Sequence, residues 1–301
     1  MRTLITAICL FPFVSLMAIG NNLKVKVNVI GEDNLPIEEA SVKVGFFGPS
    51  GTGTLETGMT NEEGSVEVAG SSRLQVRVTI DKEGYYTSEK KYDVRKKNDD
   101  GKIEVVDQNL IIVLRKKLNP IPLYTKKYTG FLPEKGSDIG FDLQIGDWVN
   151  PYGQGEKSDF IFHYTGYVND FFNYSGELNV SFSNAEDGML SEPIDERFKS
   201  SKLTLDYTAP IDGEYLKERK FIRSRVGKGK DTKKENTIES NTNYFVRLRT
   251  ELNEDDEIIK ANYAKIYNGI VFDPRSDKGV ASIHFTYYFN PEVNDTNLEF
   301  D

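Results

Sequence analysis

The densest group of side chains able to contact a ligand lies in residues 140–155, which contain the only tryptophan of the chain. Trp148 follows Asp147 directly, and Tyr152 comes shortly after it. Exposed aromatic faces flanked by carboxylates and amides can stack on sugar rings and bond their hydroxyl groups. These residues make Asp147, Trp148 and Tyr152 the candidate ligand site, and a glycan is one candidate ligand. The alternative is a turn pinned by a buried Trp148, in which glycine and proline set the backbone angles.

Four aspartates fall in or near this segment, and glycoside hydrolysis needs only two carboxyl groups at a suitable separation. They are Asp138, Asp142, Asp147 and Asp159. Sequence does not give their separations in space. A carbohydrate-active enzyme with its site near Trp148 therefore stays open as an alternative, and no residue is predicted to be catalytic.

The remaining residues that could bind a metal show no suitable spacing. His163 and His284 both lie in strand-like segments, and no pattern such as His-x-x-x-His joins them. The acidic run at residues 254–257 lacks the ligand spacing and central glycine of an EF-hand. We predict no metal site, no cofactor and no catalytic triad.

Residues 1–20 have the pattern of a secretory signal peptide, with Arg2, an apolar run from Leu4 to Ala18 and small residues at the end. Cys9, the only cysteine, lies inside this segment, so the mature chain is predicted to contain no thiol and no disulfide. An uncleaved membrane anchor is the alternative, and no later segment is apolar and long enough to span a bilayer. We expect an exported protein of a bacterial periplasm, the cell surface or the extracellular space.

The charge balance excludes one class of partner. The chain has 47 acidic and 38 basic residues, a formal net charge of −9. Residues 23–117 are nearly balanced, with 15 basic and 16 acidic side chains, so the acidity lies in the second part. Nucleic acid is excluded because phosphate binding needs clustered positive charge. A glycan or another envelope protein remains as the expected partner.

The elements that must position these residues are strands. Apolar residues alternate with polar ones in short segments separated by glycine, asparagine and proline turns, as expected for strands with one buried face. Such segments are 25–29, 40–44, 66–68, 74–80, 110–114, 178–182, 203–207 and 281–289. We predict an all-β chain with an Ig-like or transthyretin-like β-sandwich at residues 23–117, a larger antiparallel β-sandwich or barrel-like domain at 123–290 and a polar tail at 291–301.

Three segments of the first domain occur in a familiar order. They are Val27-Asn-Val-Ile-Gly-Glu-Asp-Asn-Leu-Pro-Ile-Glu-Glu-Ala-Ser-Val, then Thr60-Asn-Glu-Glu-Gly, then Lys82-Glu-Gly-Tyr85. With strands between them, they resemble the carboxypeptidase regulatory-like, transthyretin-like domain. Glu39 departs from that pattern, which more often has glycine there. The resemblance implies a β-sandwich accessory module without catalytic residues.

Together these observations predict a non-catalytic exported protein of the cell envelope or surface with a role in binding or assembly. Two alternatives stay open. One is a glycan-binding protein or carbohydrate-active enzyme with its site near Trp148. The other is a structural or adhesive subunit that pairs with another chain through an open strand edge.

Overall fold

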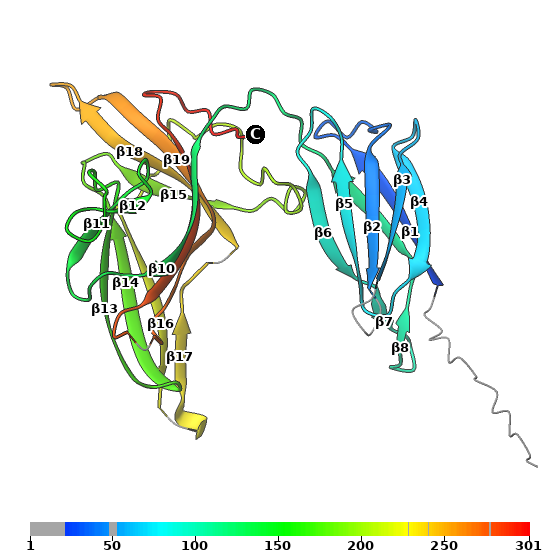
Figure 1. Cartoon of the computed structure of the whole chain (residues 1–301), viewed down its shortest axis with the longest axis horizontal. Helices are drawn as coiled ribbons and strands as arrows, with labels where there is room; N and C mark the ends of the chain where they lie inside the picture. The colour runs from blue at the N-terminus through cyan, green and yellow to red at the C-terminus, as the bar shows by residue number, and fades with distance from the viewer. Residues whose placement is uncertain (1–21, 48–52, 228, 240, 277) are drawn as a thin grey trace, which may run out of the picture. The chain divides into compact units, whose positions relative to one another are not determined.

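The computed structural model describes residues 22–301 except 48–52, 228, 240 and 277, so the predicted signal peptide lies outside the described residues. The chain divides into two compact units (Figure 1). The first comprises residues up to Ile30 with Leu35–Lys82 and Glu89–Ile112, and the second comprises Gly31–Asn34, Glu83–Ser88 and Val113–Asp301. Both are built of strands, which confirms the all-β prediction. No helix in the described ranges is long and apolar enough to cross a membrane.

The first unit is a β-sandwich of short strands. Its strands are β1 (Asn22–Ile30), β2 (Ser41–Phe47), β3 (Gly53–Met59), β4 (Ser65–Ser71), β5 (Gln75–Asp81), β6 (Ser88–Asp93), β7 (Arg95–Lys97), β8 (Ile103–Val105) and β9 (Gln108–Val113). One sheet has the order β4-β1-β9 and the other β3-β2-β5-β6, while β7 and β8 form a two-stranded ribbon. The alternating valines of β1 and β2 point into the core, as the period of two requires.

A glycine allows the two layers of this sandwich to approach closely. A Cβ atom placed on Gly70 of β4 would lie 2.5 Å from the ring of Phe46 on β2, and Phe46 is fully buried. Any larger residue at position 70 would displace this ring.

The second unit is a larger antiparallel sandwich. Its strands are β10 (Tyr124–Phe131), β11 (Asp138–Asp142), β12 (Asp147–Trp148), β13 (Phe160–Asp170), β14 (Asn173–Ser181), β15 (Gly188–Pro193), β16 (Glu218–Val226), β17 (Lys233–Asn236), β18 (Thr242–Leu252), β19 (Ile258–Asp273) and β20 (Ser282–Asn290). A single 3₁₀ turn, η1 (Gly229–Asp231), precedes β17. The two sheets have the orders β12-β11-β13-β14-β16-β17 and β10-β20-β19-β18-β15.

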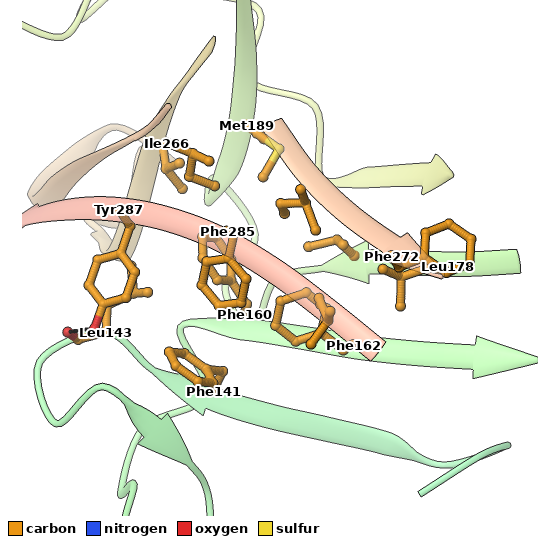
Figure 2. Close-up of a cluster of buried hydrophobic side chains, with 14 of the residues drawn as sticks. Phe141, Leu143, Phe160, Phe162, Leu178, Met189, Ile266, Phe272, Phe285 and Tyr287 are labelled. Atoms are coloured by element: carbon orange, nitrogen blue, oxygen red, sulfur yellow. Dashed lines mark hydrogen bonds between the residues drawn. The ribbon is translucent and has the colours of Figure 1, made fainter. Parts of the chain in front are cut away.

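Aromatic side chains from both sheets fill the core of this unit. Figure 2 shows Phe141 and Phe162 of one sheet lying close to Phe285 and Tyr287 of the other. The ring centroid of Phe285 is 5.2 Å from that of Phe141 and 5.8 Å from that of Phe162. Tyr287 donates a buried hydrogen bond of 2.7 Å to the carbonyl oxygen of Leu143. The alternating aromatic residues of the sequence thus become one packed layer.

One predicted strand is wrong. The alternation of Leu203 and Leu205 predicted a strand at residues 203–207, but this segment is irregular. Both leucines are buried, at 0% and 2% exposure. Leu205 belongs to a second apolar cluster that also contains Phe245 of β18 and Leu298. The alternation arises because the segment packs over a sheet face, not because it joins a ladder.

The segment predicted as a polar tail is packed into the same cluster. Leu298 and Glu299 are 0% and 1% exposed. The Leu298 N–H donates 2.8 Å to the carbonyl of Tyr207, and the Ala209 N–H donates 2.8 Å to the carbonyl of Thr296. Residues 205–209 and 296–300 therefore cover part of the five-stranded sheet together.

Candidate functional site

Trp148 of β12 is buried and belongs to the core. Its side chain is 4% exposed, and its ring meets those of Tyr128, Phe141 and Phe162 edge to face. Its indole N–H donates 2.6 Å to the hydroxyl of Tyr128. Stacking on a sugar needs an accessible ring face, which this indole does not offer. The arrangement is that of a turn held by a buried tryptophan.

The other two residues of the predicted ligand site hold the same turn. The Asp147 carboxylate accepts the backbone N–H groups of Trp148 and Gln154, both at 2.9 Å. Tyr152 is 40% exposed, and its hydroxyl bonds the carboxylate of Glu134. Asp147, Trp148 and Tyr152 thus belong to one turn. Their side chains bond or pack within the fold and do not converge on a common ligand position.

Asp142 organises the neighbouring loop. Its carboxylate is 2% exposed and accepts four backbone N–H groups at 2.9–3.1 Å. The donors are Gln144, Ile145, Glu156 and Lys157. Burial opposes ionisation, but the four donors outweigh it and hold the pKa of Asp142 below its ordinary value.

Two further buried aspartates line a polar pocket of about 360 Å³. Asp159 accepts both Nε and Nη2 of Arg249, at 2.7 and 2.8 Å, and the Leu143 N–H at 2.8 Å. Asp187 accepts the N–H and hydroxyl of Thr250 at 2.9 and 2.8 Å. Burial raises the pKa of Asp159 against the pull of Arg249. Both carboxylates are occupied by donors of the fold, which argues against general acid–base duty.

The two histidines lie in different sheets. His163 of β13 contacts Asp138, with 2.7 Å between Nδ1 and Oδ1, and His284 of β20 contacts Thr129 at 2.8 Å. Among the described residues, no group of three or more histidine, aspartate or glutamate side chains is arranged to hold a metal ion.

The turn of the β13–β14 hairpin exposes two neighbouring phenylalanines. Phe171 and Phe172 are 62% and 57% exposed, and their rings meet edge to face with 5.2 Å between centroids. The Asp170 carboxylate accepts the Phe172 N–H at 2.7 Å, an arrangement that fixes the turn. Two large apolar rings are therefore held at the surface by a defined backbone.

These rings line a pocket of about 580 Å³, here called the hairpin-tip pocket. Its lining residues are Asp170, Phe171, Phe172, Asn173, Arg225, Gly227, Gly229 and Thr232. In Figure 1 this end of the hairpin lies near the loop that joins β16 to β17. The volume falls within the usual range of small-molecule sites, and apolar walls with a few polar groups are their usual lining.

Each phenylalanine carries an arginine over one ring face. The guanidinium carbon of Arg225 is 4.7 Å from the Phe172 centroid, and that of Arg275 is 4.7 Å from the Phe171 centroid. Arg275 also bonds Asp273 at 2.9 and 2.7 Å, which raises the pKa of Arg275. The Nε of Arg225, by contrast, is buried and has no hydrogen-bond partner within the described part of the chain.

The wall opposite the hairpin depends on glycine. Gly227 has φ of 100°, and a Cβ there would lie 2.7 Å from the carbonyl oxygen of Asp231. Thr232 closes the following turn by donating 2.9 Å to the carbonyl of Gly229. The loop thus turns tightly enough to form one side of the pocket.

Sequence reasoning missed this site, although a signal was present. Phe171 and Phe172 are adjacent and lie between two alternating segments. Because successive side chains of a strand point to opposite faces, two consecutive aromatic residues rarely share one core. A surface role for at least one ring was therefore inferable.

Two open strand edges carry features that oppose pairing with another chain. β17 is four residues long and fully exposed, with Lys233 and Lys234 on it. β10, at the edge of the other sheet, carries Lys126 and Lys127. Short edge strands and edge lysines are common devices against strand addition.

No protein-family model matches the sequence, and no curated protein sequence matches it. Among solved structures, this chain aligns with the 3-chlorocatechol 1,2-dioxygenase of Rhodococcus opacus. The sequence identity is 11% and the TM-score 0.27, over 32% of this chain and 60% of that one. It aligns with BcpA, the major pilin subunit of Bacillus cereus, at 12% and 0.25, over 88% and 95%. It aligns with the shaft pilin SpaA of Lactobacillus rhamnosus GG at 11% and 0.23, over 81% and 93%. The chain spans less than two thirds of the dioxygenase, and none of these alignments carries a conclusion about activity or partners.

Proposed function

We propose that this is a non-catalytic binding protein of the cell envelope or surface, and that it takes its ligand in the hairpin-tip pocket. The exposure of Phe171 and Phe172 carries the proposal. Burying one such ring is worth about 1.5–3 kcal/mol, so leaving two of them at the surface forgoes a large stabilisation. Exposed apolar groups gathered at a pocket mark an interaction site.

The rigidity of the supporting elements favours the same conclusion. β13 and β14 pair from Ile161 and Ser181 to Asp170 and Asn173, with one irregularity in the register between Val168 and Asp170. Residues at the end of such a hairpin are held in place before a ligand arrives, which lowers the entropic cost of binding. The pocket therefore suits recognition better than chemistry, since the buried carboxylates of the unit are bonded by the fold.

For the first unit we propose a carboxypeptidase regulatory-like accessory role. The support is the order of its three sequence landmarks and its sandwich of short strands. Export is proposed from the leader pattern at residues 1–20. Ligand binding is assigned to the second unit alone.

The pocket can be tested with the neutral fluorescent probe N-phenyl-1-naphthylamine, whose emission rises in apolar surroundings. Wild-type protein should show a saturable increase that Phe172→Ala removes. Phe131→Ala is the matched control, because Phe131 is 37% exposed and also carries a cation over its ring, with Lys278 Nζ at 4.2 Å. That variant should bind the probe like the wild type. Equal binding of the probe by wild type and Phe172→Ala would show that the hairpin-tip pocket is not the binding site.

A further inference from the structure

We infer that the ligand of the hairpin-tip pocket is a small organic anion, with an apolar ring body and one carboxylate, sulfonate or phosphate group. This inference rests on the proposed function and adds the chemistry of the ligand. Its basis is the position of Arg225, which lines the pocket and stacks over Phe172.

Arg225 lies directly opposite a second cation. In the ladder of β16 and β17 its Cα partner is Lys234, so both side chains are on the same face of the sheet. Like charges placed opposite each other repel and destabilise the pair. Neither side chain has a carboxylate partner within the described part of the chain. An external anion between or beside them would relieve this repulsion.

Three other cations of this unit have carboxylate partners. Arg223 and Arg275 both reach Asp273, at 3.3 and 2.7 Å. Lys220, on the same strand as Arg225, bonds Glu177 at 2.8 Å. The chain carries an acidic excess of nine charges overall. Arg225 and Lys234 have no carboxylate partner among the described residues.

The geometry defines both ends of the ligand. A guanidinium offers paired N–H donors that match the two oxygens of an acid group, and that of Arg225 lies over the Phe172 ring. Phe171 and Phe172 offer ring faces and edges that an aromatic body contacts favourably. A pocket of about 580 Å³ accommodates one such molecule.

Two probes that share one ring body test the inference. 1-Anilinonaphthalene-8-sulfonate and N-phenyl-1-naphthylamine differ by the sulfonate alone, and dissociation constants are measured for both by fluorescence titration. Wild type should bind the sulfonate about tenfold more tightly or better, the effect expected of one charge-assisted contact. Arg225→Gln and Lys234→Gln should each reduce this preference while leaving the neutral probe unchanged. Lys220→Gln removes the same charge from the same strand and should have no effect.

The outcomes separate this inference from the proposed function. Equal affinity for both probes in the wild type overturns the anion preference and leaves the pocket intact. A preference that persists in both Arg225→Gln and Lys234→Gln overturns the residue assignment. Absence of binding by either probe overturns both proposals. Sedimentation with phosphatidylglycerol vesicles, but not with phosphatidylcholine vesicles, together with no binding of the soluble sulfonate, would show that the anion is a lipid surface and overturn the small ligand.

Discussion

The side-chain amine of Lys265 donates a hydrogen bond to the backbone carbonyl oxygen of Leu298, and so ties strand β19 to the C-terminal segment. Lys265 is fully buried, with the rings of Tyr267, Tyr288 and Phe300 at 4.5–5.3 Å from its Nζ. Burial disfavours the charged form of the amine and so lowers the pKa of Lys265 well below its ordinary value.

This depressed pKa makes stability depend on pH in a defined direction. Between the folded pKa and the ordinary value of 10.5, the unfolded chain binds more protons at Lys265 than the folded chain does. The contribution of Lys265 to the free energy of unfolding therefore rises with pH through this window. Urea unfolding of wild type and Lys265→Met from about pH 7 to about pH 9.5 should show the wild type gaining on the variant. Parallel pH curves for the two proteins would contradict the assignment.

The C-terminal segment should contribute strongly to stability. Leu298→Ala empties a fully buried site and should lower the free energy of unfolding by about 2–5 kcal/mol, as measured by urea denaturation. Val293→Ala is the control in the same segment, because Val293 is 52% exposed. It should change stability by less than about 0.5 kcal/mol. Similar small effects for both variants would mean that the segment is not packed.

Trp148 provides a direct optical test of its burial, because it is the only tryptophan of the chain. Its emission should be blue-shifted in the folded protein, resist quenching by iodide and shift to the red on unfolding in guanidinium. Addition of mono- or oligosaccharides should leave the spectrum unchanged, because the indole has no exposed face. A red-shifted emission readily quenched by iodide would place the ring at the surface.

Arg249 should be indispensable to the fold of the second unit. Arg249→Ala would leave the buried Asp159 carboxylate without its cation, at a cost of about 3–5 kcal/mol in the free energy of unfolding. Arg197→Ala is the control, since Arg197 contacts Asp195 through Nε and Nη2 at 3.0 and 2.7 Å but is exposed. Exposed pairs are worth about 0–1 kcal/mol. Equal losses in chemical denaturation would show that burial of the pair has no energetic effect.

The alternation of apolar and polar residues predicted several strands and their buried faces correctly. The alternation at Leu178 and Val180 became the buried face of β14, and that of Phe285 and Tyr287 became the buried face of β20. The same reasoning failed at Leu203 and Leu205, because a segment lying across a sheet also buries every second side chain.

The location of the candidate site could not be predicted from local sequence patterns. The chemical types at Asp147 and Trp148 suit a sugar site, but the burial of a ring depends on which strands pack against it. Phe172 and Arg225 are separated by more than fifty positions along the chain. Their association depends on the pairing of β14 with β16, which local periodicity does not specify.

The sequence by itself determined that this chain forms strands and that most of them have one apolar face, because side chains alternate across a strand whatever its neighbours are. Only the tertiary structure decided which aromatic residues are covered. Trp148 became core and Phe172 became surface because burial is a property of the packed sheets, and strand pairing between distant segments placed Arg225 beside an exposed ring.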